Sequence, residues 1–280
     1  MHLKSVTGKL FMEILNGTSG WNYNRWIGPF YPRGTTSDRM LALYSRIFPT
    51  VEIDSTFYAV PSPETVKKWA SVTPENFLFT AKIPRAITHE SSFSGVDGIF
   101  NEFVSVISLL GKKLGCLLFQ LPPTVSYRNS GDGFLKFIKN LPEIFTYSVE
   151  FRNSDWYNSV ILEEMRKRNI SVAWSDNPHT PDFNSCTARH IYLRLVGDRS
   201  IDEASFGKLI SDRSKDMRRW SVNLLEHSDD VDRAFIFANN HYAGFGPATA
   251  RMFGEFSGIK PVGWENMVSG TITGKQTTLF

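Results

Sequence analysis

The sequence is poor in cysteine, with only two among its 280 residues. Cys116 and Cys186 lie far apart, and neither belongs to a Cys-x-x-Cys pair. This spacing excludes a cysteine-rich zinc site and argues against a disulfide framework. The expected compartment is therefore the reducing cytoplasm.

Long apolar runs are also absent. No stretch is long and apolar enough to span a bilayer, so we expect no membrane association. Residues 1–11 carry two lysines but no continuous apolar segment, which argues against a secretory signal. Because Met12 directly precedes the first predicted strand, residues 1–11 are interpreted as an N-terminal tail or a misplaced start.

The glycine-rich loops that bind nucleotide phosphates are missing as well. No Gly-x-Gly-x-x-Gly follows the first predicted strand, and no Gly-x-x-x-x-Gly-Lys-Ser/Thr occurs. This removes the main support for an open, doubly wound nucleotide-binding sheet, which is the alternative to the fold predicted below.

What the sequence does contain is enough apolar surface for one large core. Hydrophobic residues make up 41% of the chain and aromatic residues 14%, which is typical of a folded globular protein. The net charge of +3 weakly favours anionic partners, but it is too small to indicate nucleic acid by itself.

Short runs of β-branched and aromatic residues alternate along the chain with stretches of helical spacing. The predicted strands are Glu13–Thr18, Thr50–Asp54, Phe77–Ile83, Leu114–Gln120, Tyr147–Arg152, Ser171–Ser175, Ile191–Val196 and Ala234–Ala238. The predicted helices are Ser37–Ile47, Pro63–Ala70, Asn101–Lys113, Gly133–Asn140, Val160–Asn169, Lys215–His227 and Pro247–Phe256. The sixth connection, Asn177–Arg189, is rich in proline and polar residues and is expected to be irregular.

Strands joined by helical connections pair in parallel, and eight such units close into a barrel. The predicted fold is thus a single α/β domain, an eight-stranded parallel β/α barrel of the TIM type, over residues 12–262. Residues 263–280 are expected to form a mobile C-terminal tail.

Ionisable residues are concentrated where the predicted strands end, which is where barrels of this kind hold their working groups. The carboxylates are Glu52, Asp54, Glu150 and Asp176, and the cations are Lys82, Arg85, Arg152 and Arg194. One interpretation is a purely structural network of buried ion pairs. The other is a site for an anionic, hydroxyl-rich ligand, in which Arg152 and Arg194 bind phosphate or carboxylate with paired hydrogen bonds.

Under the second interpretation the same strand ends supply catalysis and binding. The predicted acid–base residues are Glu52, His89, Glu150 and Asp176. The predicted substrate-binding residues are Trp21, Asp54, Tyr58, Lys82, Arg85, Gln120, Arg152, Trp156, Arg194, Asn239 and Asn240. Several aromatic side chains in these loops could stack on sugars or bases, or could simply belong to the core.

Metal chemistry is not favoured, because of the six histidines in the sequence only His89 and His241 fall near the carboxyl ends of predicted strands. No cofactor is expected, although a single Mg²⁺ held by carboxylates is compatible with the pattern. The loop after the eighth strand, Asn239–Pro247, places glycines before a helix that opens with proline. Its free backbone N–H groups predict an anion cradle or, equally, an ordinary helix start.

The order of these segments resembles the YecE-like family, also called domain of unknown function 72. The matching segments are Gly17–Trp21, Trp26, Phe30–Pro32, Val51–Tyr58, Lys82–Pro84, Thr88–His89, Gln120–Pro123, Val149–Arg152, Trp156, Asp176 and Asn239–Asn240. The resemblance implies an eight-stranded β/α barrel and no established reaction. A likeness to barrels of the endonuclease IV kind is weakened by the shortage of histidine.

One segment departs from that family pattern. Where the family usually shows Arg-x-His-Gly after the seventh strand, this chain has Arg194-Leu195-Val196-Gly197. A mechanism that needs this histidine is not expected here.

The C-terminal residues Gln276, Leu279 and Phe280 form a Gln-x-x-Leu-Phe pattern that is similar to short peptides that bind DNA sliding clamps. Leucine and phenylalanine would enter an apolar groove while the glutamine bonds to its rim. The alternative is that these side chains pack on the barrel itself.

Three functions follow from the pattern. The leading hypothesis is a hydrolase or lyase acting on a phosphate-containing, nucleic-acid-derived substrate and recruited by a sliding clamp. The second is an isomerase, epimerase or lyase acting on a small sugar phosphate or sugar acid. The third is a non-catalytic module that binds an anionic ligand.

Overall fold

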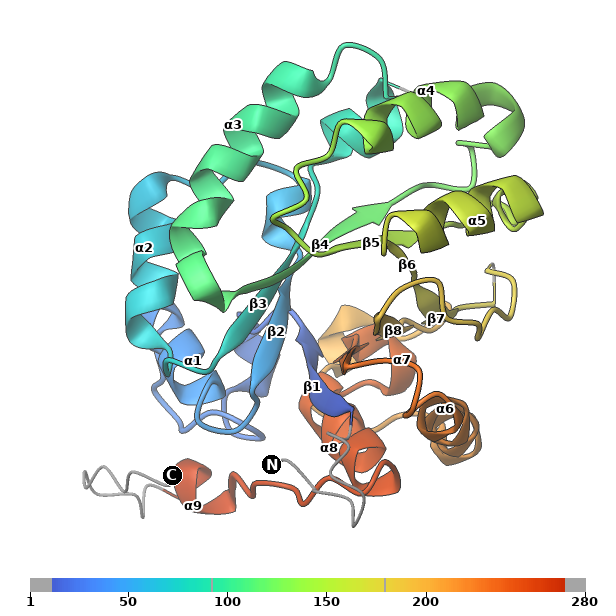
Figure 1. Ribbon diagram of the computed structural model, residues 1–280. Coiled ribbons are helices and arrows are strands. Elements are labelled where there is room, and N and C mark those ends of the chain that lie inside the picture. Colours follow the sequence, from blue (N-terminus) through green and yellow to red (C-terminus); the bar gives the residue numbers. More distant parts are fainter. Residues whose placement is uncertain (1–11, 92, 179, 270–280) are drawn as a thin grey trace.

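The computed structural model describes residues 12–91, 93–178 and 180–269, and it shows parallel strands surrounded by helices (Figure 1). Residues 1–11, and with them the predicted N-terminal tail, lie outside the described residues, as do Gln276, Leu279 and Phe280. No helix in the described part of the chain is long and apolar enough to cross a membrane.

The described residues form one sheet of nine parallel strands in the order β6-β5-β4-β3-β2-β1-β9-β8-β7. The strands are β1 Glu13–Ser19, β2 Thr50–Ile53, β3 Leu78–Lys82, β4 Leu114–Gln120, β5 Tyr147–Glu150, β6 Ser171–Val172, β7 Trp174–Asp176, β8 His190–Leu195 and β9 Arg233–Ala238. The two strands at the ends of this order, β6 and β7, follow each other in the chain. The sheet is therefore nearly closed into a barrel, as the alternating pattern predicts.

The strand number differs from the eight that the sequence predicts. The sixth predicted strand, Ser171–Ser175, is divided at Ala173 into β6, which pairs with β5, and β7, which pairs with β8. The Ala173 amide still donates to Val149 O at 2.8 Å. Because the segment changes its hydrogen-bonding neighbour at this point, two short strands stand where one was expected.

Helices cover the outside of this sheet (Figure 1). They are α1 Ser37–Tyr44, α2 Pro63–Val72, α3 Asp97–Ile107, α4 Tyr127–Lys139, α5 Ser159–Lys167, α6 Ser214–Glu226, α7 Asn240–Ala243, α8 Gly246–Phe256 and α9 Glu265–Val268. The connection 177–189 contains no helix among its described residues, in agreement with the irregular crossover predicted there.

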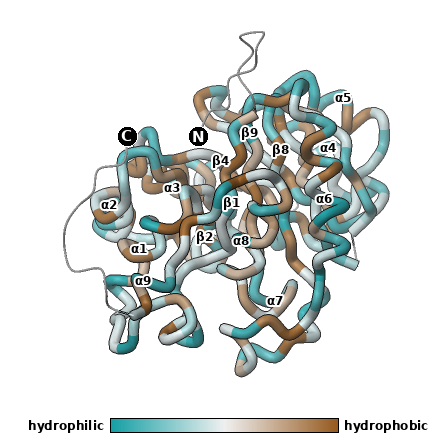
Figure 2. The backbone as a smooth tube through the Cα atoms, turned by 90° about the horizontal axis from the view of Figure 1, so that it is seen from below, coloured by the Kyte–Doolittle hydropathy of each residue, from teal (hydrophilic) through white to brown (hydrophobic). Residues whose placement is uncertain are grey.

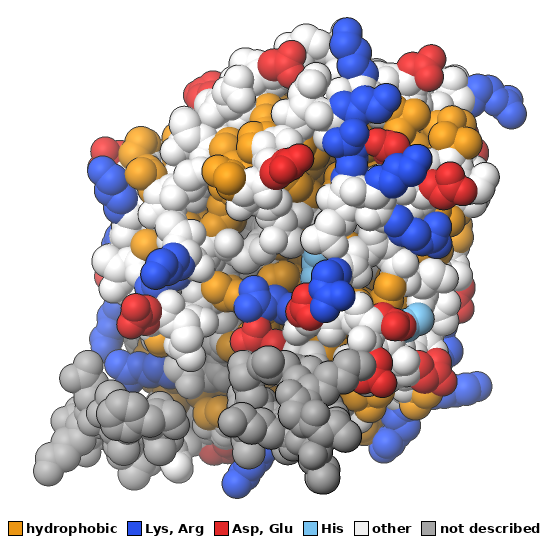
Figure 3. All heavy atoms as spheres, in the orientation of Figure 1, with side chains coloured by type: hydrophobic (Ala, Val, Ile, Leu, Met, Phe, Trp, Pro, Cys, Tyr) orange, Lys and Arg blue, Asp and Glu red, His pale blue; other side chains and the backbone are white. Residues whose placement is uncertain are grey.

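Local sequence explains these helices. In α2, proline occupies the first turn and the Ser62 hydroxyl accepts the Thr65 amide at 3.2 Å, which caps the helix. In α4, Phe134, Phe137 and Ile138 are buried on one face. Lys and Arg side chains gather over α4 and α5 (Figure 3), and both helices carry basic residues in their last turns, where they complement the helix dipole.

Alternation along the strands separates two parts of the core. Residues facing inward, such as Leu118, Tyr192 and Phe237, form a cluster inside the barrel. Their sequence neighbours, such as Leu117 and Phe119, pack outward against the helices. The hydrophobic colouring of Figure 2 accordingly recurs along the strands. The inner cluster stops below the carboxyl ends of the strands, where polar side chains replace it.

Residues 263–269, which the sequence analysis assigns to the tail, include α9. The Trp264 ring lies 5.3 Å from the Phe30 ring, and its indole N–H donates to Pro29 O at 3.0 Å. Trp264 and Met267 are buried. This short segment is thus packed on the β1–α1 connection.

Candidate active site

Arg194 is the centre of a buried charge network at the carboxyl ends of the strands. Strand alternation places it on the same inward face as Tyr192. Its Nε and Nη2 donate to the two oxygens of Glu52 at 2.9 and 2.7 Å. Its Nη1 donates to Glu150 and, at 3.1 Å, to Gln120 Oε1. Only 3% of the Arg194 side chain is exposed, so its guanidinium binds other residues of the protein and is not accessible to a ligand.

Both carboxylate oxygens of Glu52 accept two hydrogen bonds each. Besides Arg194, it accepts hydrogen bonds from the Ser19 hydroxyl and the Tyr192 hydroxyl, both at 2.7 Å. Burial by itself would raise the pKa of Glu52, but the charge and hydrogen bonds of Arg194 outweigh it and lower the pKa. Glu52 is therefore a fixed negative charge, and Thr80 extends the network by a 2.8 Å hydrogen bond to Tyr192.

Glu150 is held in the same way from the other side. It is fully buried, and it accepts a hydrogen bond from Arg152 Nε at 2.8 Å in addition to that from Arg194. Burial opposes ionisation, but Arg152 and Arg194 together hold the pKa of Glu150 at about 2. Arg152 itself is 16% exposed and lines an open pocket of about 460 Å³ with Pro123 and Asn153.

Asp54 and Lys82 form the pair that opens to the outside. Lys82 Nζ lies 3.4 Å from Asp54 Oδ1, with 11% of the lysine side chain and 29% of the aspartate side chain exposed. Lys82 also lies over the Phe57 ring, 4.5 Å from its centroid. Burial raises the pKa of Asp54, an effect that Lys82 opposes and Glu52 reinforces. Burial likewise lowers the pKa of Lys82, so both groups are shifted toward their neutral forms.

His89 stands beside this pair on η3, a turn of π-helix over Ala86–Glu90. Its Nδ1 is 2.8 Å from the Thr88 hydroxyl, and its ring meets Phe57 edge-on at 4.9 Å. Burial, followed by the nearby charge of Lys82, lowers the pKa of His89 to about 4. The imidazole is neutral near pH 7 and can exchange hydrogen bonds without carrying charge.

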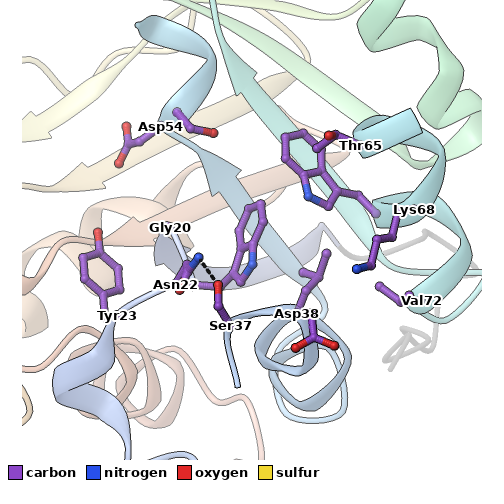
Figure 4. A pocket seen from close by; sticks show the side chains of 13 residues that line it. Gly20, Asn22, Tyr23, Ser37, Asp38, Asp54, Thr65, Lys68 and Val72 are labelled. Atoms are coloured by element: carbon purple, nitrogen blue, oxygen red, sulfur yellow. Dashed lines mark hydrogen bonds between the residues drawn. The ribbon is translucent and has the colours of Figure 1, made fainter. Parts of the chain in front are cut away.

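A pocket of about 470 Å³ adjoins Asp54. The rings of Trp21 and Trp69 line it, with centroids 5.4 Å apart at an angle of 87°. Figure 4 places Asp54 and Tyr23 on one side of the pocket and Lys68 on the other. The remaining lining residues are Gly20, Asn22, Ser37, Asp38, Leu41, Ser55, Thr65 and Val72. A volume of about 470 Å³ is within the range of small-molecule sites in proteins.

Comparisons with known proteins agree with this architecture. A family model described as "Protein of unknown function DUF72" matches residues 15–269. The chain belongs to the DUF72 family.

Curated and structural relatives of this DUF72 protein cover most of its length. It is 32% identical to the UPF0759 protein YunF of Bacillus subtilis over 258 residues, which are 82% of this chain and 90% of the relative. It is 33% identical to the UPF0759 protein YecE of Escherichia coli K12, over 79% of this chain and 88% of the relative. A crystal structure of a DUF72 family protein from Thermotoga maritima matches with a TM-score of 0.75 and 25% identity, covering 87% of this chain and 98% of that one.

Three residues of this DUF72 protein that were predicted to bind substrate do not line the pocket beside Asp54. Trp156 is fully buried, stacks on Phe151 at 4.8 Å and donates to Val125 O. Arg85 is exposed and paired with Glu90 at 2.9 Å. Tyr58 stands at the rim with 74% of its surface exposed.

The loop after β9 is also occupied internally. Asn239 Oδ1 caps α7 by accepting the His241 amide at 3.0 Å. Asn240 is buried, and its Oδ1 accepts the Trp26 indole N–H at 3.0 Å and the Gly246 amide at 2.9 Å. The Gly246 N–H, one of the donors of the predicted anion cradle, is thus already satisfied.

Asp176 lies apart from the other predicted catalytic residues. It accepts a 2.6 Å hydrogen bond from the Tyr242 hydroxyl and lines a second pocket that shares no residue with the first. Within the described ranges, no group of three or more histidine, cysteine, aspartate or glutamate side chains could hold a metal ion. Glu52 and Glu150, two of the carboxylates that the sequence offered for Mg²⁺, are engaged by Arg194.

Sequence reasoning assigned no role to Ser19, Tyr192 or Trp69. The first two could have been found, since Ser19 ends a strand and Tyr192 precedes Arg194 by two residues and so shares its face. Trp69 gave no such signal, because it belongs to a helix and reaches the pocket only through the packing of α2.

Proposed function

We propose that this protein is an enzyme that acts on a phosphate-containing substrate at the carboxyl ends of the strands of a TIM-type barrel. The observation that carries the proposal is the Asp54–Lys82 pair, which together with Arg152 is the part of the buried charge network that reaches solvent. Ionisable groups whose pKa values are shifted toward pH 7 are often found in functional sites.

Lys82 and Arg152 are the cations that would bind the phosphate. Lys82 presents its ammonium beside Asp54, and Arg152 uses its Nε on Glu150 while its side chain reaches the open pocket. A phosphate bound by both Lys82 and Arg152 would neutralise the positive charge that remains on these two side chains. Arg194 does not contact the substrate in this scheme, but it fixes Glu52 and Glu150 and thereby the positions of Lys82 and Arg152.

Asp54 is the group proposed to transfer the proton. Its raised pKa brings it closer to the working range of a general acid or base than Glu52 or Glu150, whose pKa values are lowered. His89, neutral and adjacent, would hydrogen-bond to the substrate. The roles that the sequence analysis gave to Glu52 and Glu150 become structural in this proposal.

The shape of the pocket beside Asp54 bears on the substrate. Trp21 and Trp69 would enclose a base or a sugar ring, so a nucleic-acid-derived substrate would enter as a single nucleotide unit. The volume of about 470 Å³ also favours the second candidate, an isomerase, epimerase or lyase acting on a small sugar phosphate or sugar acid. Recruitment by a sliding clamp through Gln276, Leu279 and Phe280 stays a prediction from sequence.

The test uses a panel of mononucleotides, short oligonucleotides, sugar phosphates and sugar acids, with binding measured by calorimetry and turnover by NMR. Asp54→Asn is expected to retain binding and to lose turnover by at least about a hundredfold, as is typical for removal of a general acid–base group. Lys82→Met and Arg152→Ala are expected to weaken binding. Asp232→Asn, in an exposed ion pair that lines none of these pockets, is the matched control.

Two results would overturn the proposal. Full turnover by Asp54→Asn would remove its catalytic role. Tight binding by the wild-type protein of a ligand that emerges unchanged would favour the non-catalytic module instead. Calorimetric titration of a sliding clamp with the full chain, and with a chain ending at Gly274, tests recruitment separately.

A further inference from the structure

A pocket of about 240 Å³ lies at the amino end of β1, at the opposite end of the barrel from the candidate active site. Its walls come mainly from β1, the loop between α1 and β2, α8, and residues 259–262, which follow α8 in the chain (Figure 1). Eight of its fourteen lining residues are apolar, among them Ile47 and Phe48. It shares no lining residue with the pockets at Asp54 and Arg152, so the proposed reaction makes no use of it.

Asn16 is a nearly buried polar residue of this pocket, with 7% of its surface exposed. Its neighbour Leu15 belongs to the cluster inside the barrel, so strand alternation points Asn16 outward, toward α8. There Asn16 Nδ2 donates to Ala250 O at 2.8 Å. Because a carbonyl oxygen can only accept, this bond fixes the amide with its nitrogen toward Ala250 and its Oδ1 turned away. Gly254 permits the close approach, since a Cβ there would lie 2.7 Å from Asn16 Nδ2.

The Oδ1 atom of Asn16 is an open acceptor. It accepts no hydrogen bond from any residue in the described part of the chain. Five side-chain atoms of that part are both unpartnered and fully covered, and Asn16 Oδ1 is not one of them, so it still has accessible surface. Since Asn16 lines the pocket, this oxygen offers a hydrogen bond to a donor that binds there.

The charged residues that line the pocket do not require a charged ligand. Glu13 accepts a hydrogen bond from Arg233 Nε at 2.7 Å, and Arg251 Nη1 donates to Glu265 at 2.7 Å. Lys260, the third charged lining residue, is exposed to solvent. Because moving an ion into apolar surroundings is unfavourable, the pocket favours a neutral ligand.

We propose that this pocket binds a small, neutral ring compound that carries one N–H or O–H donor, of the size of phenol or indole. The donor would bond to Asn16 Oδ1 while the ring packs on the apolar lining beside Phe48. A cavity of about 150 Å³ is enough to bind benzene, so this pocket has room for a somewhat larger ring system. A rigid ring also loses little conformational freedom when it binds.

The side-chain amide of Asn16 is the reporter for this site, because it contains the proposed acceptor. The ¹⁵N-labelled full chain would be titrated with phenol and indole while the assigned side-chain amide signals are followed by NMR. At least one of the two should shift the Asn16 signals saturably. The matched ligands anisole and N-methylindole keep the ring but lack the donor. They should bind about fivefold more weakly, which corresponds to the loss of one hydrogen bond.

Two glycine variants test the position of Asn16. In Gly254→Ala the added Cβ would displace the Asn16 amide, so the affinity for the ligand that binds should fall by at least about fivefold. Gly98→Ala in α3 is the matched control and should change nothing, because a Cβ there meets no atom within 4 Å and Gly98 does not line the pocket. Neither glycine has a positive φ, so both variants should fold, which thermal unfolding checks. Asn16→Leu, measured by calorimetry, replaces Gly254→Ala if that variant does not fold.

Any one of three results would overturn the inference. The first is that neither phenol nor indole shifts the Asn16 signals. The second is that anisole and N-methylindole bind as tightly as the parent compounds, which would remove the role of Asn16 Oδ1. The third is that Gly254→Ala, or Asn16→Leu in its place, binds the ligand as tightly as Gly98→Ala.

Discussion

Replacing Arg194 by methionine tests whether the centre of the charge network is held by its pairing. Methionine keeps an unbranched apolar stem of similar reach but removes every donor. Glu52 would then retain only the Ser19 and Tyr192 hydroxyls as hydrogen-bond donors, while Glu150 would keep Arg152. The variant therefore leaves one buried carboxylate, Glu52, without its paired cation.

The cost follows from that unpaired charge. Removing one partner of a buried ion pair typically destabilises a protein by about 3–5 kcal/mol. For a chain of this size, this corresponds to a fall in Tm of roughly 6–20 °C. The deficit should shrink on acidification, since the pKa of Glu52 rises once Arg194 is gone and protonation then removes the unpaired charge. The wild-type protein meanwhile loses its own ion-pair stabilisation as pH falls below the unfolded pKa of about 4.3.

The assay is denaturant unfolding at several pH values between neutral and acidic. Arg189→Met is the matched control, because Arg189 pairs with Asp232 at the surface with both side chains about two-thirds exposed. Exposed pairs contribute little, so this variant should unfold almost like the wild type. The double variant Arg194→Met/Glu52→Gln should recover part of the loss. A deficit for Arg194→Met that matches that of Arg189→Met, or that grows on acidification, would refute the reasoning.

Two further predictions concern residues near the carboxyl ends of the strands. The pKa of His89 is lowered to about 4, so NMR titration should find its imidazole uncharged at pH 6. The stability of the wild-type protein should fall from pH 6.5 toward 4, and this fall should be less steep in His89→Gln. An NMR midpoint near 6.5 would contradict this prediction. Gly197→Ala should lower the stability measured by thermal unfolding distinctly more than Gly258→Ala. Both glycines have positive φ, but only at Gly197 would an added Cβ lie 2.5 Å from His241 O. Equal losses of stability would contradict the role of this close contact.

Most of the barrel could be predicted because its strands are distinct in the sequence. Leu114–Gln120 is a strand over the predicted range, α6 is shifted from its prediction by one residue at each end, and α8 begins one residue earlier than predicted. The division at Ala173 could not be predicted, because a change of hydrogen-bonding neighbour leaves no trace in hydrophobic periodicity.

The candidate site was predictable in part. The rule that strand ends carry the polar groups of a barrel located Glu52, Asp54, Lys82 and Arg194 correctly as a cluster. It could not tell which of these charges satisfy one another and which remain open, because that depends on side-chain packing across the barrel. The sequence analysis for this reason assigned catalysis to Glu52 and binding to Asp54, whereas in the structure Glu52 is fully buried and the Asp54 side chain is 29% exposed.

The pairing of β1 with β9 has a consequence for synthesis on the ribosome. Ile14 is matched with Ala234, so the first strand finds one of its two neighbours only after some 220 further residues have been made. At about 5–20 residues per second, one edge of β1 waits roughly 10–45 seconds for its partner. Until then the nascent chain exposes an unpaired edge, of the kind that chaperones protect from aggregation.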